Sequence, residues 1–182
     1  MRKPRVIATW PEQTSGIFTS LLESKGVEEL SMPLTEIIET QITFKHPIEK
    51  YDWIVFTSKN GVKHFWQNQF KHKQNKIAVI GNGTAKAFEE LPFKPDFVGS
   101  GQSGQQFAQE LKPVIRPGQK LLLALGDRAS NVLEEAFAEI CIVERIDVYA
   151  TVKAPVIDPE IMTLVENNAY DVIVVSSPSA VQ

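Results

Sequence analysis

The sequence predicts an α/β protein whose parallel sheets are covered by helices on both faces. The first observation is a series of short strand-like runs in which nearly every residue is apolar, as in strands buried on both faces. The second is that residues at helical spacing follow these runs. The third is that the series begins again part-way along the chain, which predicts two similar domains. Strands alternating with helices are typical of this fold class.

The first half of the chain contains three strand-and-helix units. Strands are expected at 5–9, 53–57 and 76–81, where the runs are "RVIAT", "WIVFT" and "KIAVIG". The helical faces that follow consist of Ile17, Leu21 and Leu22 with Gly26 as a stop signal, then Val62, Phe65, Trp66 and Phe70, then Ala85, Phe88 and Leu91.

The second half repeats this order and stops before completing it. Residues 120–137 echo 5–22, with a strand at 120–126 and a helix carrying Ala129, Val132, Leu133, Ala136, Phe137 and Ile140. "DVIVVSSPSAVQ" (171–182) echoes "DWIVFTSKNGVKHF" (52–65) and includes the last expected strand, 171–176. The unit at 76–111 has no counterpart. We therefore expect the native chain to continue for about 60 residues.

Two segments without helical periodicity, 33–44 and 148–159, indicate connections between the domains. Both alternate β-branched and polar residues, so they could pair as extended strands. Such a chain leaves the first domain, builds the second and returns. The boundaries predicted are 1–35 plus 155–182 for the first domain, 36–41 and 148–154 for the linker strands, and 42–147 for the second domain.

Composition narrows the class of protein. Apolar residues make up 43% and charged residues 23%, and no apolar run is long enough to cross a membrane. The N-terminus lacks a signal-peptide pattern and the single cysteine, Cys141, cannot form an internal disulfide, so we expect a cytoplasmic protein. The net charge of −3 and the scattered basic residues argue against nucleic acid as a partner.

Metal and cofactor sites are not expected. The three histidines, His46, His64 and His72, lack the spacing of metal ligands, and one cysteine cannot supply a thiolate cluster. "GNGTAK" (81–86) has a lysine where a dinucleotide fingerprint needs a small residue, and "GQSGQQ" (101–106) lacks the lysine of a P-loop. The paired carboxylates are expected to be solvated on helix faces or a loop; these are Glu28–Glu29, Glu89–Glu90 and Glu134–Glu135.

Hydroxyl groups and glycines recur where strands end. They lie at 57–60, 81–84, 100–104, 126–128 and 176–179. Each group alone is accounted for by helix N-capping. Together they lie at the carboxyl edge of a parallel sheet, where ligands bind. Helix N-termini at this edge favour carboxylates or phosphates, so a polyanion could bind without a basic patch.

The order of several motifs resembles the uroporphyrinogen-III synthase family across all 182 residues. The motifs are "FTSKNGV", "VIGNGTAKAF", "VYATV" and "DVIVVSSPSAV". The resemblance implies two flavodoxin-like, doubly wound domains, with the second inserted into the first through a two-stranded linker and the first truncated in its C-terminal part. It also implies a monomer that needs no cofactor or metal, with a linear tetrapyrrole as its small-molecule partner and no contact with nucleic acid or membrane.

The implied activity is that of a cyclising hydro-lyase, which converts hydroxymethylbilane to uroporphyrinogen III with inversion of ring D and loss of water. Tyr149 matches the family's tyrosine and is the candidate catalytic residue, assisting departure of the substrate hydroxyl. An aromatic plug in the linker is the alternative role. The candidate substrate-binding residues are Thr9, Ser58, Lys59, Asn60, Gly81, Thr84, Ser103, Ser177 and Ser179.

One departure from the family pattern is Trp10, which stands where an arginine usually follows the first strand. Two other classes of protein are considered. A non-catalytic anion-binding or sensor module could use the same two domains. A phospho-receiver is a third possibility, but Trp10-Pro11-Glu12 replaces the acidic pocket that such a domain needs after its first strand. Analysis of the product isomers separates the enzyme from the binding module.

Overall fold

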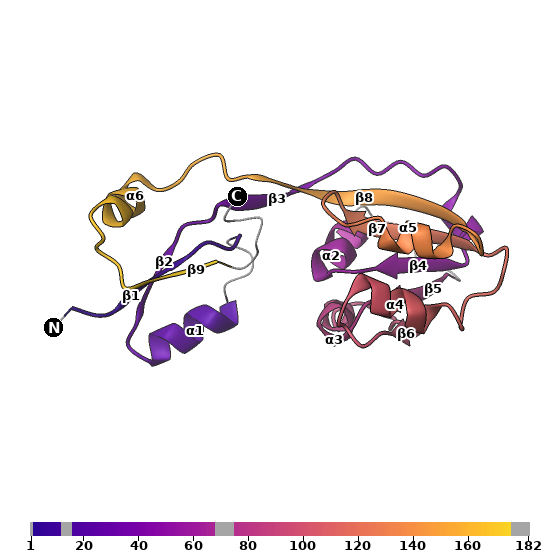
Figure 1. The fold of residues 1–182 in the computed structure, drawn as a ribbon, viewed down its shortest axis with the longest axis horizontal. Helices are drawn as coiled ribbons and strands as arrows, with labels where there is room; N and C mark the ends of the chain where they lie inside the picture. The colour runs from indigo at the N-terminus through magenta and orange to yellow at the C-terminus, as the bar shows by residue number, and fades with distance from the viewer. Residues whose placement is uncertain (1, 12–15, 68–74, 176–182) are drawn as a thin grey trace. The chain divides into compact units, whose positions relative to one another are not determined.

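The computed structural model describes residues 2–11, 16–67 and 75–175. The chain divides into two compact units (Figure 1): unit 1, with Met1–Ile38 and Thr151–Gln182, and unit 2, with Glu39–Ala150. Both contain parallel strands joined by helices, which confirms the α/β class. The segments expected as linker strands fall in β3 (Thr35–Glu39) and at the end of β8 (Ile142–Lys153).

Unit 1 is built on a parallel three-stranded sheet with the order β2-β1-β9. Its elements are β1 (Arg5–Ala8), α1 (Gly16–Ser24), β2 (Glu28–Ser31), α6 (Pro159–Glu166) and β9 (Val172–Val174). Helix α1 ends before Gly26, whose φ of 71° suits glycine at a helix C-terminus. Helix α6 and strand β2 are not predicted from the sequence. Asp158 caps the N-terminus of α6, and its carboxylate accepts from the Glu160 N–H.

A second sheet, whose strands β4 to β7 belong to unit 2, has six strands in the order β3-β8-β7-β4-β5-β6. Its remaining strands are β4 (Trp53–Phe56), β5 (Lys76–Val79), β6 (Phe97–Val98) and β7 (Lys120–Gly126), and from β8 to β6 every neighbouring pair is parallel. The helices are α2 (Lys59–Gln67), α3 (Asn82–Ala85), α4 (Gly104–Leu111) and α5 (Val132–Phe137), with short 3₁₀ turns η2 (Ile48–Lys50) and η3 (Lys86–Phe88).

The strand order corrects one expectation. Numbered within unit 2, β4 to β8 are strands one to five, and their spatial order is 3-2-1-4-5. A flavodoxin-like sheet has the order 2-1-3-4-5, so that description is wrong for unit 2. In the observed order the direction of winding reverses between β4 and β7, which are neighbours. The helices after these two strands cover opposite faces, so the carboxyl ends of β4 and β7 form the topological switch point of the sheet, the usual place for a ligand in this fold class.

The buried side chains alternate between the two faces of this sheet, as the pleat of a strand requires. Ile54 and Phe56 pack with Phe65 of α2 in one cluster, and Trp53 and Val55 pack with residues of α4 and α5 in another. Both clusters contain side chains with essentially no exposed surface. This core fixes the strand ends on which the candidate site is built.

Two local predictions are wrong. The helix expected to include Leu91 ends earlier, because α3 gives way to the 3₁₀ turn η3 and Pro92 disfavours helical geometry in the residue before it. The paired carboxylates are not all simply solvated. Glu28 lies in β2 and accepts from Arg5 Nε at 2.8 Å, and Glu134 accepts from Arg145 Nη1 at 3.0 Å. Strand pairing and loop folding create both ion pairs, so helical spacing does not reveal them.

Candidate active site

The carboxyl ends of β4 and β7 bring together residues that follow the two strands. Ser58 comes two residues after β4 and immediately before α2, and Gly126 is the last residue of β7. Tyr149 lies opposite Gly126 on the neighbouring strand β8. Three different strands therefore place these residues at one edge of the sheet, where α/β proteins bind ligands.

Ser58 is hydrogen-bonded on two sides. Its Oγ accepts a hydrogen bond of 2.9 Å from the Gly61 N–H in the first turn of α2, which is the geometry of an N-cap. The same Oγ lies 3.1 Å from the phenolic oxygen of Tyr149. A serine that the sequence marks only as a cap thus also contacts the candidate catalytic tyrosine.

A β-bulge turns Tyr149 toward this serine. Along β7 and β8 the register is regular until Leu125 pairs with Asp147, and Gly126 then pairs with Tyr149, which leaves Val148 as the extra residue. Val148 is buried in the cluster on the α2 face, and the Tyr149 ring packs against that same cluster. Two consecutive side chains of a regular strand would point to opposite faces, so the bulge re-aims the tyrosine.

The Tyr149 ring rests on the backbone of Gly126. A β-carbon at this position would lie 2.4 Å from the Tyr149 Cζ and 2.6 Å from its hydroxyl oxygen, far inside van der Waals contact. The Asp127 N–H also donates to the Tyr149 carbonyl at 3.1 Å. Glycine is therefore required at the end of β7, because the ring lies too close to this backbone for any side chain. The contact fixes the position of the Tyr149 ring, and we call this backbone surface the seat of the ring.

His64 of α2 forms another side of this seat. Its ring centroid lies 5.8 Å from that of Tyr149, and its side chain is buried. Burial lowers the pKa of His64, and the charge of Lys63 lowers it further, while Glu39 acts in the opposite direction. A lowered pKa favours the neutral imidazole near neutral pH, which can pack against an aromatic ring without a charge to solvate.

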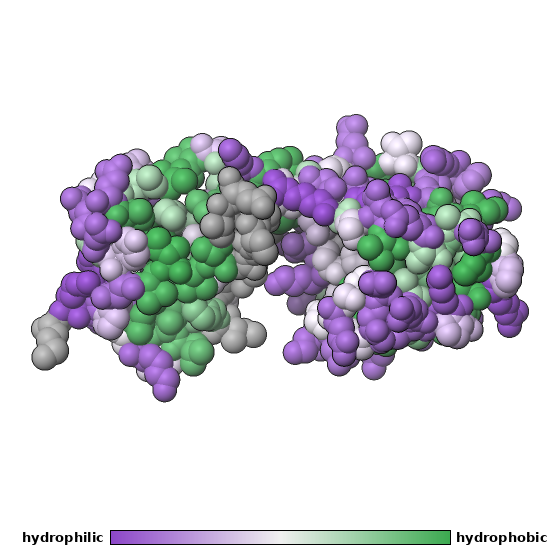
Figure 2. Space-filling view, viewed as in Figure 1, coloured by the Kyte–Doolittle hydropathy of each residue, from purple (hydrophilic) through white to green (hydrophobic). Residues whose placement is uncertain are grey.

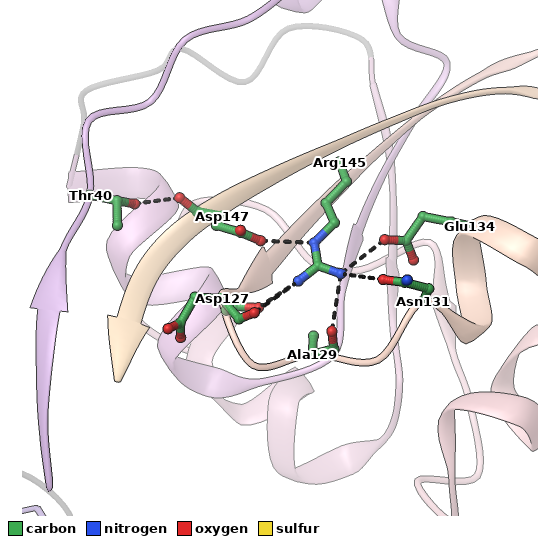
Figure 3. Close-up of polar contacts among 8 residues, drawn as sticks. Thr40, Asp127, Ala129, Asn131, Glu134, Arg145 and Asp147 are labelled. Atoms are coloured by element: carbon green, nitrogen blue, oxygen red, sulfur yellow. Dashed lines mark hydrogen bonds and ion pairs between the residues drawn. The ribbon is translucent and has the colours of Figure 1, made fainter. Parts of the chain in front are cut away.

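Arg145 holds the loop that follows Gly126 (Figure 3). Its guanidinium donates to the carbonyls of Gly126, Asp127 and Ala129 and to the side chains of three further residues of unit 2. These partners are Asp147 at 2.8 Å, Glu134 at 3.0 Å and Asn131 at 3.2 Å. The Thr40 hydroxyl donates to the Asp147 carbonyl on the same stretch of β8.

The Arg145 cluster is not predicted from the sequence. Arg145 alternates with the buried residues Glu144 and Ile146 of β8, so the strand pattern gives no signal for it and does not identify its partners. Five of the six contacts are made to residues between Gly126, the last residue of β7, and Glu134 of α5, so the guanidinium fixes the intervening loop against β8. It thereby stabilises the backbone beneath Tyr149.

A cavity of about 430 Å³ lies at the carboxyl ends of β4, β5 and β6. Its lining includes three of the predicted binding residues, Lys59, Gly81 and Thr84, together with Ile80, Asn82, Gly83, Ser100 and Gly101. Gly81 is needed because a β-carbon there would lie 2.5 Å from the Gly101 Cα of the neighbouring loop. Tyr149 is not part of this lining, although Lys59 is the chain neighbour of its partner Ser58.

The other predicted residues take different positions. Thr84 is buried, Asn60 lies in the first turn of α2, and the Ser103 Oγ accepts from the Gln106 N–H as the N-cap of α4. Thr9 belongs to unit 1, where its buried hydroxyl donates to the Val174 carbonyl at 3.1 Å. Ser177 and Ser179 lie outside the residues that the structure describes.

Within residues 2–11, 16–67 and 75–175, no three His, Cys, Asp or Glu side chains are grouped so that they could hold a metal ion. In the same part of the chain, no helix has both the length and the apolar character needed to cross a membrane.

Comparison with known proteins identifies the family. The family model described as "Uroporphyrinogen-III synthase HemD" matches residues 18–182. The chain belongs to the uroporphyrinogen-III synthase family. The resemblance seen in the sequence motifs is confirmed.

Two relatives and one solved structure illustrate the similarity. The chain is 31% identical over 136 residues to a Methanocaldococcus jannaschii protein assigned as a uroporphyrinogen-III synthase, covering 71% of this chain and 56% of the relative. It is 28% identical over 193 aligned positions to the chloroplastic uroporphyrinogen-III synthase of rice, Oryza sativa subsp. japonica, covering 98% of this chain and 63% of the relative. The chain thus spans less than two thirds of either relative.

The crystal structure of uroporphyrinogen-III synthetase from Helicobacter pylori has the same fold. It superposes with a TM-score of 0.60 at 15% identity, covering 99% of this chain and 76% of that one. At this identity the likeness concerns the fold alone. The α/β architecture described above is therefore that of a known structure as well as of the sequence pattern.

Proposed function

We propose that this protein is a cofactor-independent hydro-lyase that cyclises hydroxymethylbilane to uroporphyrinogen III, with inversion of ring D and loss of water. Family membership supports the reaction. One observation assigns the reaction to this site: the phenol of Tyr149 packs against Gly126 near the switch point of the sheet, and its hydroxyl is hydrogen-bonded to Ser58. A phenol O–H can donate a hydrogen bond to a departing hydroxyl.

In the proposed step Tyr149 acts as a general acid. The carbon–oxygen bond of the substrate hydroxymethyl group breaks, and its electron pair leaves with the oxygen. The phenolic proton completes the water molecule, while the pyrrole nitrogen stabilises the cation left on carbon. Ring closure through a spiro intermediate inverts ring D, and the proton that the substrate finally loses returns to the phenolate. One water leaves for each turnover and the phenol is restored.

The remaining residues hold the substrate rather than react with it. The helices that follow β4 and β5 present backbone N–H groups at the cavity, and these favour the carboxylates of a tetrapyrrole. Lys59 at the same cavity adds a screened positive charge. Free hydroxymethylbilane also closes unaided, to the uninverted type I isomer. Catalysis therefore depends on geometry more than on strong acid or base groups.

We also propose that unit 1 is a smaller counterpart of unit 2, whose sheet can take a further strand beside β9. Its edge strand β9 lies within the motif that echoes β4, whereas β4 is flanked by strands on both sides in unit 2. Val172 in β9 and Val175 directly after it are 49% and 41% exposed. Figure 2 shows a broad apolar area on the visible face of unit 1 and a mostly polar surface on unit 2. An added strand and helix would cover such an area.

The test is Tyr149→Phe in the full chain, with Tyr170→Phe as the matched control in unit 1. We expect Tyr149→Phe to keep its melting temperature and substrate affinity but to form the type III isomer at least about tenfold more slowly, because a positioned proton donor contributes typically 10²–10⁴-fold. Type I product should rise as spontaneous closure competes. An unchanged rate and an unchanged isomer ratio would remove Tyr149 from the mechanism.

A further inference from the structure

We propose that Ser58 is a positioning residue for Tyr149: its hydroxyl donates to the phenolic oxygen, so the phenolic proton points to the substrate. This inference rests on the proposed function, in which Tyr149 is the acid. It gives Ser58 a different role from the direct substrate contact expected from the sequence. Two features of the molecule support this role: the pair of hydrogen bonds that Ser58 makes and the fixed position of the tyrosine ring.

The hydrogen-bonding capacity of the two hydroxyls limits the arrangements. A serine hydroxyl has one proton and two lone pairs, and one lone pair of Ser58 already accepts the Gly61 N–H at 2.9 Å. In one arrangement Tyr149 donates to the second lone pair and its proton is lost to the substrate. In the other, Ser58 donates across the 3.1 Å contact and the phenolic proton remains available.

The position of Ser58 favours the second arrangement. A hydroxyl that accepts a hydrogen bond becomes a better donor, because the bonds polarise one another. Ser58 also precedes α2, a helix of nine residues, whose N-terminal end carries a partial positive charge. Both effects draw electron density from the serine oxygen and make its proton the better donor of the pair.

The seat of the ring makes this contact persistent. The Gly126 backbone lies against the phenol, and the β-bulge places Tyr149 on the same face as Val148. The His64 ring lies 5.8 Å away on α2. The phenol therefore cannot leave Ser58 without displacing packed groups, so rotation of two hydroxyl protons is the main freedom left.

The same hydrogen bond becomes stronger as the proposed reaction proceeds. When Tyr149 gives its proton to the departing hydroxyl, its oxygen becomes an anion. A hydrogen bond to an ionised oxygen is roughly twice as strong as one between neutral groups. An interaction that strengthens with the developing charge lowers the barrier rather than merely tightening ground-state binding.

The kinetic test uses three substitutions at Ser58. Ser58→Ala removes the hydroxyl and the cap, whereas Ser58→Gly removes the hydroxyl but leaves a residue that is much better tolerated than alanine at a helix N-cap. We expect both to lower kcat about tenfold or more with KM nearly unchanged, and we expect Ser58→Thr, which keeps the hydroxyl, to restore most of kcat. A KM effect without a kcat effect would indicate direct substrate binding and overturn the proposal.

A double-mutant cycle separates action through Tyr149 from independent action. In the Tyr149→Phe background, Ser58→Gly should lower kcat by less than about twofold, because the phenolic oxygen on which it acts is gone. If the two effects multiply instead, Ser58 acts on the substrate and the proposal fails. The melting temperature of every variant shows whether the fold is retained.

A second readout does not depend on activity. With ¹³Cζ-tyrosine incorporated, the resonance of Tyr149 is assigned by its loss in Tyr149→Phe. We expect Ser58→Gly to shift this resonance, Ser58→Thr to restore it, and the signals of Tyr51 and Tyr170 to stay in place. If the chemical shift of the Tyr149 resonance is the same in Ser58→Gly as in the wild type, the contact is refuted. If the signal responds but the wild type forms no type III product, the positioning survives and the proposed function fails.

Discussion

Replacing Gly126 with alanine changes the seat of Tyr149 without touching the tyrosine. The added β-carbon would lie 2.4 Å from Cζ of the ring and 2.6 Å from the hydroxyl oxygen. Carbon atoms in van der Waals contact are about 3.5–4.0 Å apart. The ring must therefore move by about 1 Å, or the carboxyl end of β7 must move by a similar distance.

A shift of this size is large compared with the tolerance of the site. The Tyr149 hydroxyl is 3.1 Å from the Ser58 oxygen, and hydrogen bonds weaken steeply once distance or angle departs from the optimum. A misplacement of about 1 Å at a reacting group can cost 10²-fold in rate. We expect Gly126→Ala to slow type III formation by about that factor and to destabilise the fold by about 1–3 kcal/mol, as overpacking does.

The assay measures product isomers by chromatography and unfolding by urea on the same preparations. Gly104→Ala is the matched control, because its β-carbon would lie 3.8 Å from Val132 Cγ1, an ordinary contact. The double variant Gly126→Ala with Tyr149→Ala should regain stability relative to Gly126→Ala alone but should not regain rate. Wild-type rate and isomer ratio in Gly126→Ala would show that the seat of the ring has no part in the reaction.

Two further predictions concern stability. Arg145→Lys should lower the free energy of unfolding by about 2 kcal/mol in urea titration, because one ammonium group cannot replace the six contacts of the guanidinium, and an unchanged midpoint would contradict this. Burial of Tyr51 and, to a smaller extent, its hydrogen bond to Glu144 raise the pKa of the Tyr51 phenol. The stability that this raised pKa gives the fold is therefore complete below the unfolded-state pKa of about 10 and is lost as the pH rises above that value. Tyr51→Phe should therefore flatten the alkaline fall in stability, and identical slopes would contradict the linkage.

Local patterns in the sequence are sufficient to predict the fold class but not the strand order. The runs at β1, β4, β5 and β7 are almost wholly apolar, and the helical spacing after β4 places Val62 and Phe65 in the core as predicted. Strand β2, with the sequence "EELS", and the two-residue β6 lack that signature and are not predicted. Strand order depends on pairing between segments that are distant in the sequence. Neither the apolar runs nor the helical spacing contains information about that pairing.

The candidate site also contains features that the sequence predicts and features that it does not. Strand ends with hydroxyls and glycines can be read from the sequence, and Lys59, Gly81 and Thr84 do line one cavity. The bulge at Val148 cannot be read, because it is a property of the register between β7 and β8. Without the bulge, Tyr149 would be expected on the face opposite Val148, and its contact with Ser58 would not be foreseen.

The N-cap reading and the functional reading of Ser58 are therefore not alternatives. Capping requires the serine oxygen to accept from Gly61, and that hydrogen bond also orients the hydroxyl and polarises it toward Tyr149. The cap is held by the same helix that packs its buried face against β4 and β7. A rigid core therefore fixes the serine, a close-approach glycine fixes the ring, and the bulge sets them face to face. None of the three needs an unusual residue, which explains why the sequence shows no concentrated cluster of acids, bases or ligands at this edge.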